Sequence, residues 1–146
     1  MRKMVLVCDD EKAIAESYAL AVETILEETV AARKRVEVRW FSGMRVRQEA
    51  ERFVQSLLES GETVDCLLLS DWAMPLSGEG TELIRALREQ VAKAPGRFTL
   101  AAVICSGGGA KAEYDADCLG VRFLRKPFSI ADLRRELLSD LIRLAA

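Results

Sequence analysis

Short, almost continuously apolar runs alternate with longer stretches in which apolar residues recur at helical spacing, and the alternation repeats five times. The short runs are Met4–Cys8, Val36–Phe41, Val64–Ser70, Phe98–Cys105 and Val121–Leu124. Apolar runs of this length, rich in β-branched and aliphatic residues, are typical of strands that are covered on both faces. The pattern therefore predicts a parallel sheet with helices on both sides.

Four of the longer stretches predict amphipathic helices. Their apolar positions are Ile14, Tyr18, Val22, Ile25 and Thr29; then Val46, Ala50, Phe53, Val54 and Leu57; then Leu83, Ile84, Leu87 and Val91; and finally Ile130, Leu133, Leu137, Leu141 and Leu144. This spacing places the apolar side chains of each stretch on one helical face. The segment between the last two strands opens with three glycines and contains few apolar residues, so we expect its helix to be short or mobile.

The chain has 146 residues, of which 50% are hydrophobic, and this is enough for one compact domain with its own core. We expect a single domain over residues 1–146 that stands alone, without an attached output domain. No stretch approaches the length of a membrane span, and the first apolar run is interrupted by charged residues after Cys8. We therefore expect a cytoplasmic protein with no membrane insertion.

The charges are nearly balanced, with 21 basic and 23 acidic residues and a formal net charge of −2. A global positive field of the kind that binds phosphate backbones is missing, so direct nucleic-acid binding is not expected. We interpret one basic cluster as solvated surface; it comprises Arg33, Lys34, Arg35, Arg39, Arg45 and Arg47.

The four cysteines are far apart in the sequence, and the chain has no histidine that could complete a zinc site. Three of them, Cys8, Cys66 and Cys105, lie in the predicted strands. We interpret these three as reduced, buried side chains.

Polar residues follow four of the five predicted strands at the point where each ends. Asp9 and Asp10 follow the first strand, Asp71 the third, Ser106 the fourth and Lys126 the fifth. Because parallel strands deliver their carboxyl ends to the same edge of a sheet, these side chains should meet in one crevice. Each residue alone also fits a structural role, such as a helix N-cap for Asp10 or a turn residue for Asp71. Their coincidence at one edge favours a functional site.

Three carboxylates in one crevice repel one another unless a cation lies among them or some are protonated. Oxygen ligands without histidine or cysteine select a hard cation, and a site with few protein ligands suits Mg²⁺. Lys126 and Ser106 would then bind the oxygens of a phosphoryl group. The sequence therefore predicts a magnesium-dependent phosphoryl site.

Four short motifs occur in the order that is typical of one family. They are Val-Cys-Asp-Asp ending at Asp10, Asp65 to Pro75 with Asp71 at the strand end, Ser106-Gly107, and Phe123 to Phe128 with Lys126-Pro127. Over essentially its whole length the chain resembles the CheY-like receiver domains of two-component response regulators. The resemblance implies a flavodoxin-like α/β fold with five parallel strands in the order 2-1-3-4-5 and helices on both faces.

The resemblance also implies a role for each matching residue. Asp71 matches the phosphoacceptor, and Asp9 and Asp10 match the acidic pair that binds Mg²⁺ with the backbone carbonyl of Ala73. Ser106 matches the hydroxyl that follows the phosphoryl group, and Lys126 matches the lysine that pairs with it. Two further matches are Phe123, the aromatic residue that changes rotamer on activation, and the Lys126-Pro127 bond, which is cis in the family.

A receiver of this kind would take its phosphoryl group from a sensor histidine kinase or a histidine phosphotransfer protein and act by binding a downstream protein. It would catalyse only its own phosphorylation and dephosphorylation, so we do not expect an enzyme with an external substrate. Two alternatives stay open. One is a pseudo-receiver that binds partners without phosphorylation. The other is an aspartate-based phosphatase, although the run from Asp9 to Ala13 departs from the D-x-D-x-[TV] pattern of such enzymes.

Overall fold

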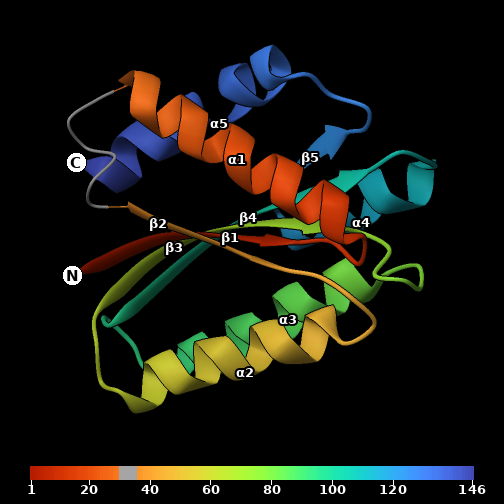
Figure 1. Cartoon of the computed structure of the whole chain (residues 1–146). Helices are drawn as coiled ribbons and strands as arrows, with labels where there is room; N and C mark the ends of the chain where they lie inside the picture. The colour runs from red at the N-terminus through yellow and green to blue at the C-terminus, as the bar shows by residue number, and fades with distance from the viewer. Residues whose placement is uncertain (30–35) are drawn as a thin grey trace.

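In the computed structural model, which describes residues 1–29 and 36–146, a five-stranded parallel sheet lies between two layers of helices (Figure 1). The strands pair in the order β2-β1-β3-β4-β5. They are β1 (Arg2–Cys8), β2 (Val36–Phe41), β3 (Val64–Asp71), β4 (Phe98–Ser106) and β5 (Arg122–Arg125). The predicted α/β fold and strand order are confirmed.

Each strand is followed by one helix along the chain, as the apolar spacing predicts. They are α1 (Lys12–Thr29), α2 (Val46–Glu59), α3 (Glu79–Ala92), α4 (Ala110–Leu119) and α5 (Ile130–Ala145). With 10 residues, α4 is the shortest helix in the described ranges, as expected from its few apolar residues. Gly109 precedes it at φ 66°, a conformation that glycine adopts without strain. None of the helices within residues 1–29 and 36–146 is both long enough and apolar enough to cross a membrane.

The strand limits differ from the prediction at the ends that carry polar residues. Asp71 is the last residue of β3 and pairs with Cys105, and Ser106 is the last residue of β4 and pairs with Arg125. The predicted strands ended one residue earlier, at Ser70 and Cys105, because the last residue of each ladder is polar. In the basic cluster, residues 33–35 lie outside the described residues, while Arg39 and Arg45 are exposed, as expected, and Arg47 is half-buried.

Alternate residues of the central strands contribute to two separate cores. Val5, Val7, Leu67 and Leu69 face α1 and α5, whereas Leu6 and Leu68 face α2 and α3. Cys8, Cys66 and Cys105 are buried and free, as predicted, and Cys118 is exposed. Because both faces are packed, the carboxyl edge of the sheet is held rigidly by the strands beneath it.

Gly80 in the first turn of α3 lies against the end of β3. Its N–H donates to the carbonyl of Trp72 at 2.9 Å, and a Cβ atom at this position would lie 2.1 Å from the carbonyl oxygen of Asp71. Only glycine therefore permits α3 to start this close to the residue that we expect to carry the chemistry.

We predict that Gly80→Ala lowers the free energy of unfolding by about 2–3 kcal/mol, because the new methyl group displaces the backbone of Asp71. The matched control is Gly108→Ala, where a Cβ atom meets nothing within 4 Å and which we expect to change stability by about 0.5 kcal/mol or less. Urea denaturation measures both variants. Equal stability of the two variants would contradict the close approach.

Candidate functional site

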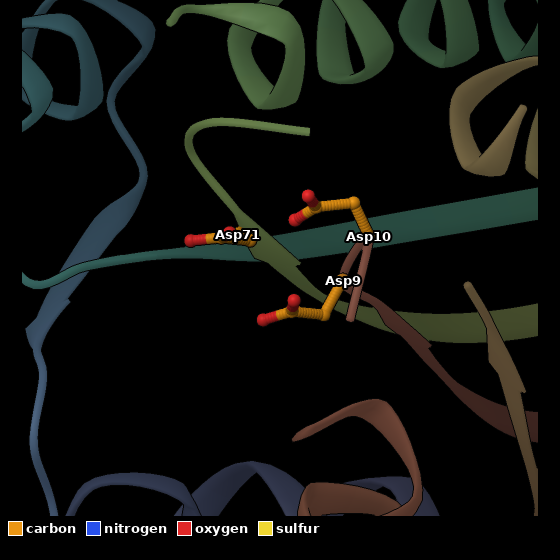
Figure 2. A group of neighbouring side chains, drawn as sticks. All are labelled: Asp9, Asp10 and Asp71. Atoms are coloured by element: carbon orange, nitrogen blue, oxygen red, sulfur yellow. The ribbon is translucent and has the colours of Figure 1, made fainter. Parts of the chain in front are cut away.

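Three carboxylates meet at the carboxyl edge of the sheet, where the ends of β1 and β3 lie side by side. Figure 2 shows Asp9, Asp10 and Asp71 extending toward the same space from these two strand ends. One oxygen atom from each carboxylate lies within 4.8 Å of the others. The structure therefore brings together the three acidic residues that the sequence placed in one crevice.

Asp9 is the most enclosed of the three, with 2% of its surface exposed. Its Oδ1 accepts the N–H of Glu11 at 3.0 Å, so Asp9, rather than Asp10, closes the turn into α1. The backbone carbonyl of Asp10 accepts the N–H of Gly43 at 3.0 Å, which ties this loop to the loop after β2. The interpretation of Asp10 as a simple helix cap is not supported by these contacts.

Lys126 bridges two of the three carboxylates, those of Asp9 and Asp71. Its Nζ lies 2.9 Å from Oδ2 of Asp9 and 3.1 Å from Oδ1 of Asp71. The side chain of Lys126 is 17% exposed, and the backbone N–H of Lys126 donates to the carbonyl of Ser106. The peptide bond from Lys126 to Pro127 is cis, as the resemblance implied, and so is the bond from Met74 to Pro75.

The pKa values of these groups reflect their burial and the charges beside them. Burial raises the pKa of Asp71 to about 6; the charge of Lys126 opposes this rise, and the charge of Asp9 adds to it. Burial and the neighbouring Asp9 likewise raise the pKa of Asp10. Burial lowers the pKa of Lys126, but its hydrogen bond to Asp9 and the charge of Asp71 outweigh this and raise it overall. Lys126 is therefore charged at neutral pH, and it neutralises only part of the carboxylate charge.

Ser106 is buried at the end of β4, one strand away from Asp71. Its hydroxyl is engaged within its own loop, where it donates to the carbonyl of Gly108 at 3.1 Å and accepts the N–H of Gly108 at 3.2 Å. To donate a hydrogen bond to a group bound at Asp71, the hydroxyl would have to stop donating to the carbonyl of Gly108.

Phe123 lies on β5 and is partly buried against the core formed with α2 and α3. The guanidinium of Arg125 lies 5.5 Å from the centre of its ring. Ala73 lies in the loop after β3, half-buried and two residues beyond Asp71.

Two aromatic residues near the site were not identified from the sequence. Trp72 donates its backbone N–H to Oδ1 of Asp71 at 3.1 Å, and its indole N–H to Oδ2 of Asp115 on α4 at 2.9 Å. The ring of Tyr18 on α1 stacks on Phe128 and lies 5.6 Å from Nζ of Lys126. The position of Trp72 directly after Asp71 was a signal, whereas nothing in the sequence connects Tyr18 to Lys126.

We predict that Asp71→Asn raises the free energy of unfolding by about 1–3 kcal/mol at pH 7.5 in the absence of divalent cations. Folding raises the pKa of Asp71 from 3.8 to about 6, so the ionised carboxylate destabilises the folded state above that range and costs nothing below it. The increase in the free energy of unfolding of the variant over the wild type should therefore be absent below about pH 4 and complete above about pH 6.

Urea denaturation in a chelator, between pH 3.5 and 8, measures this profile. A variant that is no more stable than the wild type at pH 7.5, or one whose advantage grows on acidification, would contradict the assigned burial of the charge.

No protein-family model matches the chain, and no curated protein matches it in sequence. Solved structures do match over nearly the whole chain. A signal receiver domain from Vibrio parahaemolyticus is 17% identical with a TM-score of 0.66, and covers 99% of this chain and 93% of its own.

Two further structures agree with this match. A CheY-like receiver domain from Methylobacillus flagellatus is 22% identical with a TM-score of 0.60, and covers 95% of this chain and 98% of its own. A response regulator from Thermotoga maritima is 23% identical with a TM-score of 0.59, and covers 98% of this chain and 99% of its own. The chain therefore has the fold of the CheY-like receiver domains of response regulators.

Proposed function

We propose that the chain is a two-component receiver that accepts a phosphoryl group on Asp71. The observation that carries this proposal is the cluster of Asp9, Asp10 and Asp71 with Lys126 bonded to two of the three carboxylates. One buried and two partly buried carboxylates this close together destabilise the folded state, because they lose hydration and repel one another, so a merely structural role does not explain the cluster. Together with the receiver fold, it supports phosphoryl transfer.

The cluster fits Mg²⁺ because its donors are all carboxylate oxygens. We assign Asp9, Asp10 and Asp71 as the residues that would hold the ion, with the backbone carbonyl of Ala73 as a further ligand. Mg²⁺ would supply positive charge that offsets the charge of the carboxylates and of the transferred group.

The residues of the chain supply position and charge for an in-line displacement. An oxygen of the Asp71 carboxylate attacks the phosphorus of a phosphohistidine, the new O–P bond forms, the P–N bond breaks, and the imidazole leaves and takes up a proton. Lys126 already lies 3.1 Å from Asp71, so its ammonium is placed to pair with a phosphoryl oxygen attached there. The donor would be a sensor histidine kinase or a histidine phosphotransfer protein.

The response to phosphorylation would begin at Ser106 and at Phe123. A phosphoryl oxygen competes with the carbonyl of Gly108 for the Ser106 hydroxyl, and charged acceptors form the stronger hydrogen bond. Movement of this loop and of the Phe123 ring would shift the population of states on the α4 surface and change how a downstream protein binds. The chain would thus act in the cytoplasm as a signalling protein and turn over only its own phosphoryl group.

We predict an Mg²⁺-dependent gain of one phosphoryl group when the chain is incubated with acetyl phosphate or a phosphoramidate. Intact-protein mass spectrometry should detect this gain in the wild type and not in Asp71→Asn. Asp65→Asn is a matched control, because Asp65 lies near the other end of β3 and pairs with Arg143. It should be labelled like the wild type. No gain in any variant, together with undetectable Mg²⁺ binding, would favour a pseudo-receiver.

Replacing Lys126 should separate metal binding from phosphoryl transfer. We predict that Lys126→Gln binds Mg²⁺ roughly 3- to 30-fold more tightly, because it removes a positive charge close to the carboxylates, whereas Asp10→Asn binds it at least about tenfold more weakly. Isothermal titration with MgCl₂ at pH 7.5 measures both. Lys126→Gln should nevertheless accept the phosphoryl group more slowly. Weaker Mg²⁺ binding in Lys126→Gln would contradict the electrostatic account.

A further inference from the structure

The outer edge of β2 is open over its described residues. β2 is an edge strand that pairs with β1, and in Figure 1 it crosses in front of the other strands between α1 and α2. A surface hollow follows this edge; it is lined by Arg2, Glu37, Val38, Arg39, Trp40 and Phe41. Trp40 is 38% exposed. Such an edge is a template for pairing with another strand.

One contact shows which residues of β2 direct their backbone N–H and C=O groups toward β1 and which direct them outward. The carbonyl of Phe41 accepts the N–H of Asp9, which follows β1, so the polar backbone groups of Phe41 face inward. Because these groups alternate along a strand, Glu37 and Arg39 also face β1, and Val36, Val38 and Trp40 direct theirs outward. No hydrogen bond from residues 1–29 or 36–146 reaches the outward groups of Val38.

The charges on the edge are self-complementary in one antiparallel register. When two copies pair about Val38, each Glu37 lies opposite the Arg39 of the other copy, and Val36 lies opposite Trp40. A shift that places Val38 opposite Trp40 brings Arg39 against Arg39, and a shift that places Val36 opposite Val38 brings Glu37 against Glu37. Like charges directly opposite destabilise a strand pair, so the register centred on Val38 is favoured over these two shifted registers.

The same register agrees with the directions of the backbone groups of β2. Val38 opposite Val38 and Val36 opposite Trp40 are pairs whose backbone groups point toward each other. Glu37 opposite Arg39 then falls at the positions without hydrogen bonds, where facing side chains are closest. Glu37 is 41% and Arg39 51% exposed at the edge, and within one chain Nε of Arg39 lies 3.8 Å from Oε2 of Glu37. A bidentate contact with Arg2 holds Glu37 in place.

We propose that the edge of β2 pairs with the β2 edge of a second copy of this chain, in antiparallel orientation and centred on Val38. The two five-stranded sheets then join into one continuous sheet across a two-fold axis. The interface lies at the edge of the sheet opposite β5. The proposed pairing does not depend on phosphoryl transfer at Asp71.

Cysteine crosslinking tests the register directly, in a Cys118→Ser background that removes the exposed thiol. In the proposed register the two Cα atoms of residue 38 lie about 5.5 Å apart, within disulfide range. The two Cα atoms of residue 40 lie roughly 14–15 Å apart, beyond that range. Mild oxidation with diamide should therefore link Val38→Cys into a dimer and leave Trp40→Cys monomeric, as seen by mass and on non-reducing gels.

The association itself is measured by sedimentation equilibrium of the full chain. Arg39→Glu places a carboxylate opposite Glu37 and should raise the dissociation constant of the dimer at least about tenfold. The control is Arg97→Glu, at an exposed loop residue, which should change this constant by less than about twofold. Circular dichroism checks that both variants fold. A chain that is monomeric up to about 1 mM, or a Trp40→Cys variant that crosslinks as well as Val38→Cys, would overturn the proposal.

Discussion

The repulsion among three carboxylates at one edge of the sheet is the constraint on which the rest of the site depends. The β1 and β3 ends place Asp9 and Asp71 in adjacent positions, and the packed helices on both faces prevent them from separating. Lys126 offsets part of the negative charge through contacts of 2.9 and 3.1 Å, but burial, with the charge of Asp9 adding to it, still raises the pKa of Asp71 to about 6. The folded chain therefore holds an uncompensated negative site that a hard cation would stabilise.

The loops around the site connect this electrostatic centre to the helices. Gly80 allows α3 to contact the backbone of Asp71, and Trp72 links the same residue to Asp115 on α4. Asp115 also pairs with Lys111, which contributes to holding its pKa below the ordinary value. Trp72 thus connects Asp71, through its backbone N–H, with α4, through its indole N–H.

The fold and the location of the site follow from the sequence because both depend on local patterns. Apolar runs define the strands, and a parallel sheet brings their carboxyl ends together whatever the details of packing. The contacts of Ser106 with Gly108, and of Trp72 with Asp115, depend on which rotamers the surrounding structure allows. The close approach at Gly80 and the self-complementary edge of β2 depend on where distant segments pack. Sequence patterns carry no direct record of either.

Asp71, and neither of its acidic neighbours, is the residue that we propose to be phosphorylated. Borohydride reduces an acyl phosphate on aspartate to homoserine, which peptide sequencing by mass spectrometry locates to a single position. After treatment with acetyl phosphate and Mg²⁺, we expect homoserine at position 71 alone. Homoserine at position 9 or 10, or its formation at position 71 without a divalent cation, would contradict the account.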